Sequence, residues 1–154
     1  MMLRLLPLLR RLAREHAGSM AIETALVTPV LVIMTLGGFE ASGMVARQSE
    51  LQTAAAEAAT IAMAATPDSY SKVQTVRSVI ESSTGLDDDH VSVYRLKRCG
   101  TDNDYISYYD DCDSSEATST YLYIYITDTY TPQWVDFGIG SPLTYRIRRT
   151  VQIS

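Results

Sequence analysis

Cys99 and Cys112 are the only cysteines in the chain, and their spacing allows three kinds of chemistry. They could form a disulfide, contribute to a zinc site, or remain free thiols. A zinc site normally takes four ligands, and two further ligands are missing within range. In an exported domain we therefore expect a disulfide, which would close a loop of about 14 residues and stabilise the fold by roughly 3 kcal/mol.

The segment around the two cysteines is rich in acidic side chains. Oxygen ligands at this density could bind Ca²⁺, although the ligand order and central glycine of an EF-hand are missing. We expect a solvated polar loop, with a calcium site as the alternative. Tyr105, Tyr108 and Tyr109 lie in the same loop and could contact a partner or a host surface. The acids are Asp102, Asp104, Asp110, Asp111, Asp113 and Glu116.

No nucleophile and base stand out as a catalytic pair. The two histidines are His16, near the N-terminus, and His90, at the start of an expected strand. The motifs G-x-S-x-G and H-E-x-x-H and the P-loop do not occur. We therefore expect a protein that is not an enzyme and that needs no cofactor.

Glu23 lies just before a long uncharged stretch, residues 24–39. Residues 19–39 would form a helix about 31 Å long, which matches the hydrocarbon core of a bilayer. A carboxylate near that core costs free energy and usually has a partner. A buried core helix is the alternative to a membrane span, and a cleaved signal peptide fits less well because the apolar run continues into a second helical stretch.

Charge is distributed unevenly along the chain. Residues 1–18 carry a net charge of +3 from four arginines and one acid, whereas the remaining 136 residues carry −8. Basic residues flanking a membrane span stay on the cytoplasmic side, so the chain after Arg47 is expected outside the inner membrane. The strongly acidic body argues against binding to nucleic acid.

The spacing of apolar residues predicts an α+β fold. One continuous helix is expected over residues 19–65, and a second, capped by Asp68 or Ser69, is expected to end at Gly85. Alternating residues then predict strands from Val91 to near Arg98, over 118–129 and over 143–153, in a small antiparallel sheet with one disulfide loop. The expected segments are a leader (1–18), a transmembrane part (19–46) and an exported part (47–66) of the long helix, and an α+β domain (67–154).

The N-terminal pattern G-S-M-A-I-E-T-A-L-V-T-P-V-L resembles the processing site of type IV pilins, and more closely the TadE-like family of tight-adherence (Tad, or Flp) pilus systems. The resemblance implies cleavage after Gly18 by a prepilin peptidase, making Ser19 the new N-terminus. It also implies a pilin-like long helix, other pilin-like subunits and an inner-membrane assembly platform as partners, and a role in surface adhesion. The matching positions are Gly18, Ala21, Glu23, Ala25, Leu26 and Pro29.

The chain departs from the pilin pattern at two positions. Ser19 stands where many type IVa pilins have phenylalanine, so N-methylation is not implied, and Thr24 stands where the major Flp pilins have tyrosine. The chain is also longer than those pilins. These differences favour a minor pilin or pseudopilin over the main filament subunit.

Two residues of the apolar run have a possible role in assembly. Glu23 could pair with the N-terminal ammonium of a neighbouring subunit, or it could simply reach water by snorkelling. Pro29 leaves the carbonyl of Ala25 without its N–H donor, so a kink or weak point is expected, and Thr28 or Thr24 could bond the local backbone. Simple tolerance of a proline in a membrane helix is the alternative.

Two other functions fit parts of the sequence. One is a signal-anchored periplasmic domain, unrelated to pili, whose acidic tyrosine-rich loop binds calcium or a glycan. The other is a membrane-tethered hydrolase. Loss of about 18 residues by processing would distinguish a pilin-like protein from a simple anchor.

Overall fold

The computed structural model describes residues 16–154, so most of the basic leader lies outside the described residues. The chain divides into two compact units, one ending at Ser42 and the other spanning Gly43–Ser154. One long helix, α2 (His16–Ala65), contributes to both units. The helix confirms the continuous segment expected over 19–65 and continues through Pro29.

Helix α3 (Tyr70–Thr84) follows α2 after a short turn at Pro67. Ser69 occupies the N-cap position. At the other end Gly85 adopts the left-handed conformation with φ 70°, and its N–H donates to the carbonyl of Glu81. The left-handed conformation cannot continue a right-handed helix, so α3 ends there. Glycine adopts it without the strain that a side chain would add. Both predicted limits of the second helix are confirmed.

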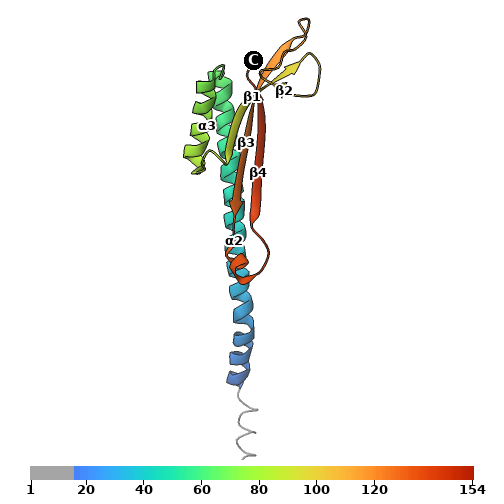
Figure 1. The fold of residues 1–154 in the computed structure, drawn as a ribbon. Helices are drawn as coiled ribbons and strands as arrows, with labels where there is room; N and C mark the ends of the chain where they lie inside the picture. Colours follow the sequence, from blue (N-terminus) through green and yellow to red (C-terminus); the bar gives the residue numbers. More distant parts are fainter. Residues whose placement is uncertain (1–15) are drawn as a thin grey trace, which may run out of the picture. The chain divides into compact units, whose positions relative to one another are not determined.

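The four strands form one antiparallel sheet in the order β2-β1-β3-β4. Strands β1 (Val91–Cys99), β3 (Thr118–Tyr130) and β4 (Leu143–Gln152) agree with the expected strands. In the register, Val93 faces Ile124 on β3, and Ile124 faces Arg149 on β4. Figure 1 shows these strands alongside the second half of α2, with α3 at the same level.

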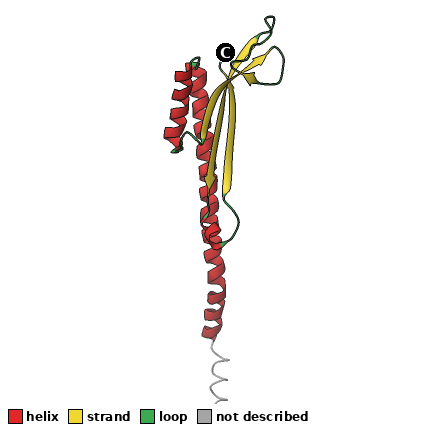
Figure 2. Ribbon diagram, viewed as in Figure 1, coloured by secondary structure: helices red, strands yellow, loops and turns green. Residues whose placement is uncertain are grey.

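The core of the Gly43–Ser154 unit lies between α2, α3 and one face of the sheet. Leu122, Ile124 and Ile126 of β3 are fully buried, and the tyrosines that alternate with them are partly exposed. The α2 side of the core consists mostly of alanine, and Figure 2 shows this part of α2 beside the strands. The α2 and α3 members of the core are Leu51, Ala55, Ala58, Ala59, Ala62, Val73, Val76 and Ile80.

Two short elements were not predicted from the sequence. Strand β2 (Ile106–Ser107) pairs with β1 inside the loop that was expected to be irregular, with Leu96 facing Ser107. A 3₁₀ helix, η1 (Gln133–Phe137), lies in the connection between β3 and β4. Both are too short to produce a repeating apolar pattern, which is the signal used for the longer elements.

Candidate functional site

The first half of α2 exposes apolar side chains on all sides. It is long and apolar enough to cross a membrane, and its most apolar stretch is not buried within the described residues. Large side chains such as Ile33 and Phe39 are 70% and 82% exposed. A helix that is apolar all round, and that the rest of its own unit does not cover, is typical of a membrane span. The helix is therefore consistent with a single-pass membrane protein.

Glu23 lies in this apolar part of α2, and its side chain is exposed. Among residues 16–154 it makes no ion pair. Gly18 and Ser19 lie on the same helix, less than two turns before it. The arrangement leaves the carboxylate available to a group from another molecule.

The threonines near Pro29 bond to the helix backbone, but not at the carbonyl that the proline leaves without a donor. The Thr24 hydroxyl donates to the carbonyl of Met20 at 2.8 Å, and the Thr28 hydroxyl donates to that of Thr24 at 2.7 Å. The carbonyl of Ala25 is thus not their acceptor. The bonds satisfy the hydroxyls themselves inside an apolar stretch.

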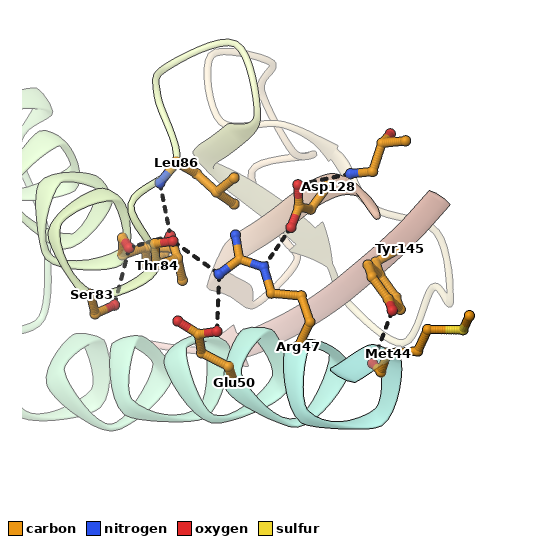
Figure 3. Close-up of polar contacts among 10 residues, drawn as sticks. Met44, Arg47, Glu50, Ser83, Thr84, Leu86, Asp128 and Tyr145 are labelled. Carbon is orange, nitrogen blue, oxygen red and sulfur yellow. Dashed lines mark hydrogen bonds and ion pairs between the residues drawn. The ribbon is translucent and has the colours of Figure 1, made fainter. Parts of the chain in front are cut away.

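Arg47 is the first basic residue after the apolar run, and it connects three elements (Figure 3). Its Nε donates to Asp128 of β3 at 2.6 Å, and its Nη1 donates to Glu50 at 3.0 Å and to the carbonyl of Thr84 at 3.1 Å. Burial acts to lower the pKa of Arg47, but the hydrogen bonds to Asp128 and Glu50 outweigh it and raise the pKa above its usual value. The cluster thus joins α2 to β3 and to the end of α3.

A second contact joins β4 to α2 near Arg47. The Tyr145 hydroxyl donates to the carbonyl of Met44 at 2.9 Å, as Figure 3 shows. Burial, together with the negative charge of Asp128, raises the pKa of Tyr145. The sequence did not predict that Arg47 and Tyr145 hold α2 against the sheet. The available signal was the position of Arg47, a cation directly after an uncharged helix.

Cys99 and Cys112 form a disulfide, as predicted, with their Cα atoms 5.5 Å apart. The bond links the end of β1 to the segment leading into β3. Within the described residues, no three His, Cys, Asp or Glu side chains gather closely enough to hold a metal ion. Asp102, Asp104, Asp110, Asp111 and Asp113 are therefore not brought together as a calcium site.

The loop tyrosines differ in their surroundings. The Tyr108 ring lies under the guanidinium of Arg95, 3.7 Å from its centre, and Tyr105 packs edge-on against Tyr121 of β3 with ring centres 5.1 Å apart. Tyr109 is 81% exposed. Tyr109 is thus the most exposed of the three, whereas Tyr105, still 45% exposed, and Tyr108 each pack against a side chain of the sheet.

Tyrosines also cover the outer face of the sheet. The rings of Tyr94 and Tyr123 lie 5.0 Å apart, and the guanidinium of Arg148 lies 5.5 Å from the ring centre of Tyr125. His90 makes a polar pair elsewhere, with its Nδ1 2.6 Å from Asp87. The hydrogen bond to Asp87 raises the pKa of His90.

Helix α2 contains the part of the chain that matches a known family. Residues 18–60 match the family model of TadE-like proteins. The match confirms the resemblance noted in the sequence, and it supports a protein associated with a Tad pilus. Neither the comparison with curated proteins nor that with solved structures found a match.

The TadE-like segment lies entirely within α2 and begins at Gly18. It includes the uncovered apolar stretch with Glu23 and Pro29, and it extends through Arg47 into the alanine-rich core face. Both the exposed carboxylate and the residue that anchors α2 to the sheet therefore belong to the matched segment.

Proposed function

We propose that this chain is a minor pilin or pseudopilin that takes part in assembling or initiating a Tad-type pilus used in surface adhesion. The observation that carries the proposal is the TadE-like match beginning at Gly18, on a helix whose apolar half is uncovered. The disulfide-linked α+β unit supports it, since such a bond persists outside the cytoplasm.

In this proposal a prepilin peptidase removes the basic leader, residues 1–18, on the cytoplasmic side of the inner membrane. Residues 19–46 span the membrane, residues 47–66 continue the helix, and residues 67–154 form the periplasmic domain. The new ammonium of Ser19 pairs with Glu23 of a neighbouring pilin-like subunit, and Pro29 acts as the weak point of the span. Such a pair offsets the cost of a carboxylate near the membrane.

The protein acts by packing and surface contacts, with other pilin-like subunits and the assembly platform as partners. The apolar part of α2 offers helix-packing positions at Gly37 and Gly38, where an added Cβ would meet nothing within 4 Å. The Gly43–Ser154 unit, called the exported unit from here on, presents exposed tyrosines on its loop and sheet face. Catalysis has no part in this proposal.

Processing is the direct test. The variant Gly18→Leu should leave the precursor uncut in cells that contain the peptidase, because the bulky side chain replaces the glycine at the junction. The wild type and the control Gly37→Leu should lose 18 residues, the length of the proposed leader. Mass spectrometry of the purified proteins gives the N-terminus directly. An intact Met1 in the wild type, or normal cleavage of Gly18→Leu, would overturn the proposal and favour a simple signal anchor.

A further inference from the structure

The connection between β3 and β4 carries exposed apolar side chains. Phe137 is 81% exposed, Ile139 is 64% exposed, and Leu143 at the start of β4 is 42% exposed. Residues 131–142 contain one acid, Asp136, and no lysine or arginine. The segment thus differs from the acidic loop at the other end of β3.

The apolar side chains are held outward by a hydrogen-bonded turn. The N–H of Gly138 donates to the carbonyl of Val135 at 2.9 Å, and that of Ile139 donates to the carbonyl of Trp134 at 3.1 Å. Gly138 has φ 75°, a conformation that other residues rarely adopt. These features fix the backbone of the turn, and in this conformation Phe137 and Ile139 are exposed.

This turn lies at one defined end of the exported unit. Tyr130, the last residue of β3, places its hydroxyl oxygen 2.9 Å from where a Cβ on Gly43 would lie, and Tyr145 bonds to Met44. Phe39, the last residue of the uncharged run, precedes Gly43 by four residues. A chain spans at most about 3.6 Å per residue, so the run ends within about 14 Å of this contact.

We propose that the turn docks on the membrane, with Phe137, Ile139 and the exposed part of the half-buried Trp134 entering the headgroup region on the exported side. The inference rests on the proposed function, in which residues 19–46 span that same bilayer. Tryptophan and other aromatic side chains favour this region because one part of the ring system is apolar and another is polar. The turn therefore provides a second, shallow membrane attachment beside the span. Together the two attachments fix the orientation of the exported unit on the bilayer surface.

Trp134 is the only tryptophan, so its fluorescence reports on this turn alone. The full chain is reconstituted in phosphatidylcholine vesicles in which the lipid is brominated either near the headgroup or near the chain ends. Two reporter chains carry Trp134→Phe with a single new tryptophan, either Phe39→Trp at the end of the uncharged run or Tyr109→Trp. Tyr109 is as exposed as Phe137 but lies beside Val93 and Tyr94 of β1. These two residues face Ile124 and Tyr123, six and seven residues before the Tyr130 end of β3, so Tyr109 lies roughly 20 Å farther along the sheet at the rise of a strand.

Trp134 should emit at shorter wavelength than the Tyr109→Trp reporter and should be quenched most by lipid brominated near the headgroup. The double change Phe137→Ser with Ile139→Ser should reduce this quenching, and Tyr109→Ser should not. An oxidised Cys99–Cys112 pair in each variant checks that the exported unit has folded.

The three reporters separate the two proposals. Quenching at Phe39→Trp without quenching at Trp134 would overturn membrane docking while leaving the span intact, and would point to another protein as the partner of the turn. Absence of quenching at Phe39→Trp would overturn the span itself. Equal quenching at Trp134 and at the Tyr109→Trp reporter would mean that the turn contacts lipid no more than the loop around Tyr109 does. This result would also overturn the inference.

Discussion

Arg47 is the first basic residue after the apolar run of α2, and it also makes contacts with distant parts of the fold. It follows the uncharged run, yet its side chain is only 23% exposed because it reaches under the sheet to Asp128, which is 16% exposed. A partly buried carboxylate that loses its cation keeps its desolvation cost without the compensating hydrogen bond. The residue thus fixes α2 to β3 and to the end of α3 directly after the proposed span.

Replacing Arg47 should therefore destabilise the exported unit. We expect Arg47→Met to lower the free energy of unfolding by about 1–3 kcal/mol, because Oδ2 of Asp128 and the Thr84 carbonyl lose the Arg47 donors, and only Oδ1 of Asp128 keeps its hydrogen bond from the Thr129 N–H. Urea unfolding of the purified chain in detergent, followed by near-ultraviolet circular dichroism, measures the change. Arg149→Met is the matched control, since Arg149 is exposed and makes no ion pair within residues 16–154. Equal effects of the two variants would contradict the prediction.

Glu23 is the residue on which the proposed assembly depends. Glu23→Gln should still enter the membrane, since insertion is easier without the charge, and should still be cleaved because Gly18 is intact. It should fail to join the pilus, and Glu23→Asp should be intermediate because the shorter side chain keeps the charge. Piliation and co-purification with pilus components are measured in strains whose only copy is the variant.

The control for this experiment is Glu57→Gln, the same change at an exposed position farther along α2. It should assemble like the wild type. If Glu23→Gln also assembles at wild-type levels, the carboxylate does no more than reach water, and pairing with a neighbouring ammonium loses its support.

At the level of elements, the sequence predicted the helices and strands that are long enough to show a repeating apolar pattern. It did not predict the elements that are too short for one. The apolar stripes of α2 and α3 and the alternation of Leu122, Ile124 and Ile126 gave the right elements and the right buried face. Strand β2 and η1 were missed because two to five residues cannot show a period. The Arg47 cluster was missed for a different reason, since its partners stand 37 and 81 positions away and only the tertiary fold brings them together.

The disulfide is the element-level feature that the sequence predicted most directly, and it should be worth several kilocalories per mole. We expect Cys99→Ser with Cys112→Ser to lower the free energy of unfolding by about 2–4 kcal/mol, because the unfolded chain is no longer cross-linked. Urea unfolding of wild type and variant gives the difference. Reduction of the wild type by dithiothreitol should produce the same loss.

Hydrogen exchange locates the effect of the disulfide. In the double serine variant, amides of β2 and the end of β1 should exchange faster, since only the pairs Leu96–Ser107 and Lys97–Ile106 hold β2 to the sheet. The middle of β3 should keep its protection because it is paired on both sides. An unchanged stability, or two reactive thiols in the native exported protein, would contradict the assigned role of the bond.

For the whole molecule, the charges on the two sides of the apolar run are opposite in sign. The leader has +3 within 18 residues, whereas residues 47–154, after the proposed span, carry 9 basic and 15 acidic side chains and thus −6. Orientation is set by lysine and arginine close to the span, whereas acids and distant residues contribute little. The four leader arginines, not the acidity of the exported unit, should therefore decide which side the domain occupies.

The disulfide makes this orientation measurable, since the thiols stay reduced in the cytoplasm and oxidise outside it. Changing Arg10, Arg11 and Arg14 to glutamine should lower the fraction of chains with an oxidised Cys99–Cys112 pair, because part of the population inserts with the domain inside. The same change at Arg146, Arg148 and Arg149, far beyond the span, should leave that fraction at the wild-type level. Alkylation of cells before and after reduction counts the thiols in each strain. An unchanged oxidised fraction in the leader variant would show that the arginines do not set the orientation, and the periplasmic assignment would then need another cause.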